Sequence, residues 1–191
     1  MIIVVVPLFL LVLILLFWQF SNIISIFYGC PYVMADKKVI KKAIEISGLK
    51  KRDIFYDLGC GRGDVLIEAA KLGAKCTGIE ISPYYYIYVK IKTCLWSKIY
   101  YFLCWSRKSR RVTKNRLSIR VEYQNVYNVD LATADVVYCY LLPKFLKKLA
   151  PKFQKEMKPG SRLVSIGFPI PELKNEKKYN IENQKIFIYK F

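Results

Sequence analysis

The chain has 191 residues, no histidine, and 32 Lys and Arg against 14 Asp and Glu, which gives a formal net charge of +18. A chain of this length can form one domain with a sizeable core. Since its 6 cysteines form no Cys-x-x-Cys pair, no zinc or other metal site is expected, and the thiols are interpreted as reduced structural residues.

The N-terminal segment is strongly apolar. Residues 2–18 are uninterrupted apolar residues, a second apolar cluster lies between 23 and 28, and the first charged residue is Asp36. A bilayer core needs about 20 helical residues, so residues 1–28 are predicted to form a transmembrane anchor. A cleaved signal peptide is the alternative, but a basic start and an Ala-x-Ala-like cleavage site are missing. Lysines follow at positions 37, 38, 41 and 42, so the positive-inside rule predicts a single-pass membrane protein with a cytoplasmic C-terminal domain.

Beyond the span, strands and helices alternate, which predicts an α/β fold with a doubly wound, mostly parallel sheet. Residues 29–50 are interpreted as a connector and a first helix capped by Asp36, and residues 51–191 as one domain. Strands are predicted at 53–56, 75–80, 119–123, 135–140, 162–168 and 186–189, and helices from Val65, from Pro83 and over 145–157. Residues 169–185 leave little room for another helix, so an abbreviated C-terminal edge is expected.

The most informative motif is DLGCGRGD at residues 57–64, between the first strand and its helix. A glycine-rich turn there lets the backbone approach a ligand at the carboxyl ends of the strands. A dinucleotide fingerprint would need Gly or Ala where Asp64 stands. Instead, glycines at 59, 61 and 63 follow an acidic residue at the strand end. In this pattern the chain resembles the class I S-adenosyl-L-methionine (SAM) methyltransferases.

The resemblance implies their Rossmann-like fold and SAM as the cofactor. Asp57 would hold the ammonium group of SAM, directly or through water, and the glycines would admit its methionine portion. Glu80, about 20 residues beyond the start of the loop, would reach the ribose hydroxyls. Asn125 would replace the acid that contacts the adenine amino group, accepting through its carbonyl oxygen. The predicted cofactor-binding residues are Asp57, Gly59, Cys60, Gly61, Gly63, Glu80, Ile81, Asn125 and Val126.

Further motifs narrow the resemblance: PYV at 31–33, EISP at 80–83, YLLP at 140–143 and FP at 168–169. They are similar to a small membrane-anchored family that includes the lysine methyltransferases of the ADP/ATP translocase and of the c subunit of ATP synthase, with short prokaryotic relatives. The chain departs from it at Arg62, commonly Asp there, and at Asp64, commonly Arg. Met34-Ala35 also replaces a Pro-Thr or Pro-Ser pair. These departures bear on substrate choice more than on cofactor binding.

Methyl transfer from a sulfonium needs in-line positioning and exclusion of water more than acid–base groups. A lysine acceptor must be neutral, which costs about 4–5 kcal/mol at pH 7 for a pKa near 10.4, and an apolar pocket can supply part of this. The predicted catalytic-site residues are Tyr140, Pro143 and Tyr32, with Tyr138 as a further candidate for the pocket wall. Ordinary packing is the alternative for the tyrosines, and no general base stands out.

No acidic residue occurs from Ile81 to Val121, and residues 84–116 interleave aromatic rings with Lys and Arg. This pattern favours a helix resting on the bilayer. An RNA-binding surface, or a sheet-covering helix followed by a solvated loop, stays open.

The resulting hypothesis is a membrane-anchored SAM-dependent methyltransferase that N-methylates lysine in a membrane or membrane-associated protein. An RNA methyltransferase is favoured by the charge, but residues 140–143 lack the Asn/Asp-Pro-Pro-aromatic motif of base-amino enzymes. A lipid or quinone methyltransferase and a non-catalytic SAM-binding scaffold are further alternatives.

Overall fold

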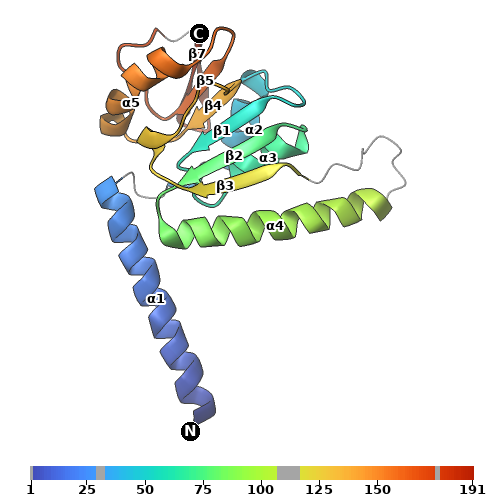
Figure 1. Cartoon of the computed structure of the whole chain (residues 1–191), viewed down its shortest axis with the longest axis vertical. Coiled ribbons are helices and arrows are strands. Elements are labelled where there is room, and N and C mark those ends of the chain that lie inside the picture. The colour runs from blue at the N-terminus through green and yellow to red at the C-terminus, as the bar shows by residue number, and fades with distance from the viewer. Residues whose placement is uncertain (1, 29–32, 107–116, 175–176) are drawn as a thin grey trace.

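The computed structural model describes residues 2–28, 33–106, 117–174 and 177–191. Its centre is a seven-stranded sheet in the order β3-β2-β1-β4-β5-β7-β6 (Figure 1). β1 to β5 are parallel, and β7 runs antiparallel to β5 and β6. The strands are β1 (Ile54–Leu58), β2 (Lys75–Glu80), β3 (Ile119–Tyr123), β4 (Val136–Cys139), β5 (Arg162–Ile166), β6 (Lys177–Ile181) and β7 (Gln184–Lys190).

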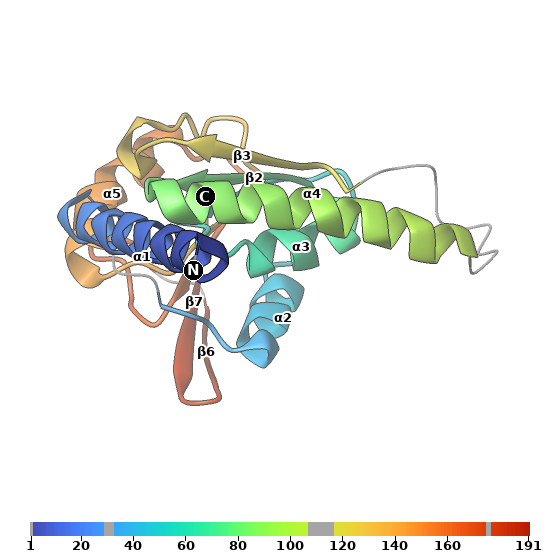
Figure 2. The ribbon, with the colours of Figure 1, turned by 90° about the horizontal axis from the view of Figure 1, so that it is seen from below.

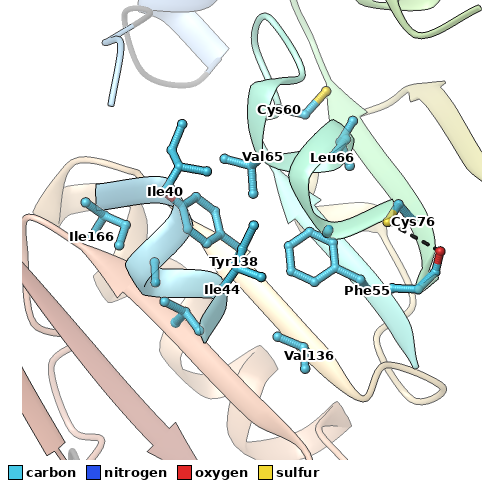
Figure 3. Close-up of a cluster of buried hydrophobic side chains, with 14 of the residues drawn as sticks. Ile40, Ile44, Phe55, Cys60, Val65, Leu66, Cys76, Val136, Tyr138 and Ile166 are labelled. Atoms are coloured by element: carbon cyan, nitrogen blue, oxygen red, sulfur yellow. Dashed lines mark hydrogen bonds between the residues drawn. The ribbon is translucent and has the colours of Figure 1, made fainter. Parts of the chain in front are cut away.

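Helices cover both faces of this sheet. The side chains of α2 (Lys37–Ile46) and α3 (Asp64–Lys71), with Val89 of α4 (Pro83–Ser106), form one core cluster, and α5 (Pro143–Glu156) packs into the other. Successive side chains of β4 point to opposite faces of the sheet, so Val136 and Tyr138 belong to the first cluster and Val137 and Cys139 to the second. Figure 3 shows the first cluster, in which Ile40 and Ile44 of α2 lie beside Tyr138. Burial on both faces explains why β4, with the sequence VVYC, is apolar throughout.

The expected fold class is confirmed, and the predicted strands and helices agree with the structure to within about two residues at most ends. Asp36 is the N-cap of α2 and accepts a hydrogen bond from the N–H of Lys38, at 2.7 Å. β6, which forms a hairpin with β7, is missing from the sequence prediction. No helix occurs between β5 and β6 in the described residues, so the C-terminal edge is abbreviated in its helices but not in its strands.

α1 (Ile2–Tyr28) projects from the domain, and α4 crosses the side of the domain from which α1 leaves (Figures 1 and 2). Within the described part of the chain, Val4–Phe27 is the one segment that is long and apolar enough to cross a membrane. Only Ser21 and Ser25 of its described side chains are buried, both near the end of the helix that meets the domain.

Candidate functional site

The glycine-rich loop joins the end of β1 to the start of α3. Gly59, Gly61 and Gly63 have φ angles of +80°, +49° and +71°, a backbone region that residues other than glycine rarely adopt. The N–H groups of Gly59 and Cys60 both donate to the carbonyl oxygen of Ile79, at 2.9 and 3.0 Å, which holds the loop against β2. At Gly63 space is also required, because a Cβ would lie 2.3 Å from Cγ2 of Val89.

Asp57 lies in β1 just before this loop and is 2 % exposed. Its Oδ2 atom is buried and has no hydrogen-bond partner. Burial raises the pKa of the Asp57 carboxyl well above its ordinary value, and the nearby carboxylates of Glu80 and Asp64 raise it further. A buried carboxylate of this kind is costly unless a donor or a cation meets it.

Glu80, at the end of β2, is held by backbone amides. Its Oε2 atom accepts from the N–H of Gly61 at 2.8 Å, and Oε1 accepts from Ile81 and Ser82 at 3.0 and 2.8 Å. Burial raises the pKa of the Glu80 carboxyl, while the three amides act in the opposite direction. An ionised carboxylate offers about four acceptor positions, so one on Oε2 stays open beside the loop.

The pocket beyond the loop lies at the carboxyl ends of the strands, where ligands of parallel sheets bind. Asn125 and Val126 line it, and Asn125 Oδ1 accepts the N–H of Tyr127 at 3.1 Å, which caps the short 3₁₀ helix η1 (Val126–Asn128). From β4, the ring of Tyr138 reaches the pocket, and its buried hydroxyl has no hydrogen-bond partner. Burial raises the pKa of Tyr138 well above its ordinary value, so the hydroxyl stays a proton donor.

The structure brings most of the predicted site residues together in this pocket: Asp57, Gly59, Cys60, Gly61, Glu80, Ile81, Asn125, Val126, Tyr138 and Tyr140. Gly63 does not line it, because Gly63 is the N-cap of α3 and faces α4. Pro143 does not line it either, because Pro143 is the first residue of α5, and Leu141 and Phe145 form the wall there. Tyr32 lies outside the described residues. The roles of all these residues stay predictions.

Several residues that line the pocket are not among the predicted site residues. Ser25 of α1 reaches the pocket, as do Met34 and Ala35 before α2 and Tyr85 of α4. The one available signal was the serine pair at positions 21 and 25, polar residues one helical turn apart in an apolar helix. Met34 and Ala35 were singled out in the sequence only as a departure that bears on substrate choice, and nothing in the local pattern indicates that Tyr85 approaches the glycine loop.

The chemistry of the pocket fits SAM. Among the described lining residues, Asp57 Oδ2 and Tyr138 Oη are the buried polar atoms without a hydrogen-bond partner. A ligand amine would satisfy the first, and a polar ligand group the second. The lining is otherwise rich in apolar and aromatic side chains, which suits a sulfonium and an adenine ring. Among the described residues, no group of three His, Cys, Asp or Glu side chains is placed to hold a metal ion.

Comparison with known proteins agrees with this chemistry. Residues 57–177 match the family described as the ANTKMT methyltransferase domain. A protein-lysine N-methyltransferase of Saccharolobus islandicus is 32% identical over 167 residues, which cover 83% of this chain and 92% of that protein. A lysine N-methyltransferase of Xenopus laevis, named for the C subunit of ATP synthase, is 25% identical over 74% of this chain, which spans only 54% of the relative's length.

Solved structures share the fold. An RNA methyltransferase from Salinibacter ruber, in complex with S-adenosyl-L-homocysteine, superimposes with a TM-score of 0.70 at 23% identity and covers 83% of this chain and 93% of its own. A ribosomal protein L11 methylase from Lactobacillus delbrueckii gives a TM-score of 0.61 at 17% identity over 80% and 77% of the two chains. At these identities the likeness concerns the fold alone.

Proposed function

The chain belongs to the ANTKMT methyltransferase domain family, and from this premise we propose that it transfers a methyl group from SAM to a lysine side chain of a membrane or membrane-associated protein. The family match, the relatives and the fold confirm the expectation of a SAM-dependent methyltransferase. The lysine acceptor is supported by the relative with 32% identity, named a protein-lysine N-methyltransferase, whose match covers 83% of this chain.

One observation carries the assignment of the cofactor pocket: the buried, unpartnered Oδ2 atom of Asp57 beside the glycine-rich loop. When bound, SAM supplies a methyl group on a positively charged sulfur. Asp57 meets the ammonium group of the cofactor, and the open position on Glu80 Oε2 accepts a ribose hydroxyl. Asn125 uses its carbonyl oxygen to cap η1, so we expect it to position that turn beside the adenine while Val126 provides an apolar contact.

The acceptor lysine enters where Tyr138, Tyr140 and Phe145 line the pocket. Their rings exclude water and disfavour the charged ammonium, which supplies part of the roughly 4–5 kcal/mol needed to obtain the neutral amine at pH 7. The unpartnered hydroxyl of Tyr138 lies near Asp57 and is available to orient a polar group of the cofactor or the acceptor. In-line positioning in a dry pocket is the main catalytic contribution of these residues.

α1 supports a membrane acceptor. It has the length and composition of a membrane span, and its Ser25 lines the same pocket as Asp57 and Glu80. The pocket therefore lies at the end of the proposed anchor, and tethering raises the effective concentration of acceptors in the same membrane. The lysines that follow α1 support a cytoplasmic methyltransferase domain, because the positive-inside rule favours basic residues on the cytoplasmic side of a span.

The direct test is incubation of the full chain with labelled SAM and native membranes, followed by mass spectrometry of the labelled material. We expect methylated lysine in a membrane protein, and we expect loss of labelling with Asp57→Asn. The matched control is Asp130→Asn, which removes an exposed carboxylate outside the pocket and should label as the unaltered chain does. Label confined to RNA, lipid or quinone would reject the lysine acceptor. SAM binding without any transfer would indicate a non-catalytic scaffold.

A further inference from the structure

α4 carries an apolar stripe on the side that faces away from the sheet. Ile87, Ile91, Leu95 and Ile99 are 48%, 57%, 53% and 51% exposed. They are four residues apart, so with about 3.6 residues per turn they form one line along the helix. The opposite side of α4 is buried, since Val89 is 0% and Thr93 6% exposed. Four exposed large aliphatic side chains in a row are unusual for a surface in water.

Positive charge accompanies the stripe. α4 contains no acidic residue, and the side chains of Lys90 and Lys98 are exposed beside the apolar line. Lys92, on the other flank, turns back to the domain, where it pairs with Asp64 at 2.7 Å and donates to the carbonyl oxygen of Arg62 at 2.9 Å. An apolar face bordered by lysines is typical of helices that lie in the plane of an anionic membrane surface.

The stripe faces the side on which α1 leaves the domain. Tyr84, in the first turn of α4, is on line with the stripe, three residues before Ile87, and its ring lies 6.4 Å from that of Phe17 in α1. The N–H of Tyr84 donates to Ser21 Oγ at 2.9 Å, which fixes the end of α1 to the start of α4. Figures 1 and 2 agree that α4 lies between the rest of the domain and the projecting α1.

We propose that α4 is an interfacial helix whose stripe (Ile87, Ile91, Leu95 and Ile99) inserts into the surface of an anionic bilayer. The proposal rests on the membrane anchoring proposed above, because α1 must enter that same bilayer. An outward row of aliphatic side chains cannot pair with phosphates, so an RNA surface is not favoured here. Since Ser25 and Tyr85 line the cofactor pocket, contact through α4 holds the pocket beside the lipid headgroups and selects acceptor lysines close to the membrane surface.

Spin labels on the full chain test the depth of α4. In a background with Cys30, Cys94 and Cys104 replaced by serine, single cysteines are placed at Leu95, at Asn183 in the β6–β7 turn, and at Leu11 in α1. The protein is reconstituted into nanodiscs of phosphatidylcholine with phosphatidylserine. We expect the Leu95 label to be protected from a water-soluble relaxation agent and exposed to oxygen, at a depth of about 5–10 Å. The Asn183 label should stay accessible from water.

The Leu11 label separates the two proposals. If it is buried while the Leu95 label is as water-accessible as the Asn183 label, the interfacial helix is rejected and the anchor stands. If the Leu11 label is also in water, the anchor is rejected, and the interfacial helix with it. If single-stranded RNA immobilises the Leu95 label and the bilayer does not, α4 contacts nucleic acid instead.

A variant pair tests the consequence for transfer. Ile91→Asn with Leu95→Asn should lower transfer to a membrane-embedded acceptor about tenfold or more, because two apolar side chains lose their burial in lipid. The affinity for SAM in detergent should stay unchanged. The matched control, Leu72→Asn, alters a side chain that is 50% exposed at the end of α3 and does not belong to the stripe. Transfer by the double variant at the rate of this control would overturn the proposal.

Discussion

Two buried carboxylates share the pocket and differ in what they bind. The oxygens of Glu80 accept three backbone N–H groups, so this side chain joins the glycine loop to the end of β2. Asp57, equally buried, leaves Oδ2 without a partner. We infer that Glu80 organises the pocket and that Asp57 is the group whose burial is compensated when the cofactor binds.

This difference predicts opposite effects of Asp57→Asn on stability and on binding. Because burial raises the pKa of Asp57, the folded state holds the proton more tightly than the unfolded state does. The contribution of Asp57 to the free energy of unfolding therefore falls as the pH rises above about 3.9, the pKa of an aspartate in the unfolded chain. We expect Asp57→Asn to stabilise the free protein by about 1–3 kcal/mol at neutral pH and to have little effect near pH 3.

The same variant should bind SAM about 30-fold more weakly or worse, because the ammonium loses its charged partner. Chemical unfolding in detergent and calorimetry with SAM measure the two effects. A variant that is destabilised at neutral pH, or that binds SAM normally, would contradict the role assigned to Asp57.

Gly63 is expected to be the most sensitive glycine of the loop. Gly63→Ala places a Cβ against Val89 at a φ of +71°, so we expect a loss of about 1–2 kcal/mol from the backbone and about 1–3 kcal/mol from overpacking. Gly160→Ala is the matched control, since φ is +81° there and nothing lies within 4 Å of the added Cβ. Denaturant unfolding of the two variants separates backbone strain from the clash. Equal losses would mean that Val89 gives way.

At this scale the sequence predicts what depends on strand ends. The sequence predicts that Asp57, Glu80 and Asn125 lie close together, because each stands at or just after the end of a recognisable strand. Parallel strands bring their carboxyl ends to one edge of the sheet. The sequence could not show that Gly63 and Pro143 lie outside the pocket lining, because whether a residue lines a pocket or starts a helix depends on a side-chain direction that spacing does not give. That Ser25 lines the pocket could be predicted only by knowing where α1 contacts the domain.

At the scale of elements, the start of α4 is capped from outside. The first N–H groups of a helix lack partners within it. Ser82 Oγ, just before the helix, lies 3.4 Å from the N–H of Tyr85, and Ser21 Oγ of α1 accepts the N–H of Tyr84 and bonds to Ser82 Oγ. Because the N–H of Ser82 also donates to Glu80, these bonds link α1, α4 and the cofactor pocket.

Ser21→Ala should therefore expose the amide of Tyr84. Removing the acceptor costs about 1 kcal/mol, so we expect amide hydrogen exchange at Tyr84 to become about fivefold faster. Ser25→Ala is the control, because Ser25 Oγ donates only within α1, to the carbonyl oxygen of Ser21. Unchanged exchange at Tyr84 in the first variant would show that the contact between α1 and α4 does not persist in solution.

β6 shows why one element escaped the sequence analysis. It pairs only with β7 at the edge of the sheet, and its sequence KKYNI is mostly exposed, so it lacks the apolar character of the other strands. The hairpin turn has φ angles of +47° at Glu182 and +62° at Asn183, a geometry usually signalled by Asn-Gly. The strands β1, β4 and β5 were predictable because covering both faces of the sheet makes most of their residues apolar.

At the scale of the whole molecule, activity should depend on sharing a membrane with the acceptor. If α1 anchors the chain, an acceptor in the same vesicle is presented at an effective concentration in the millimolar range. We expect rapid methylation when enzyme and acceptor are co-reconstituted, and almost none when they occupy separate vesicles. Quantifying methyl-lysine in the two preparations tests this. Equal rates would show that the chain acts without membrane tethering.

The serine cap also limits how freely α1 can be exchanged. If α1 anchors the chain, a chimera that carries an unrelated span of equal length and hydropathy would still be retained in lipid, but it would have no hydroxyl to offer the first turn of α4. Transplanting the serines together with their spacing is then the minimum requirement for a working fusion. The N-terminal helix is accordingly part of the folding unit of the catalytic domain rather than an interchangeable tether.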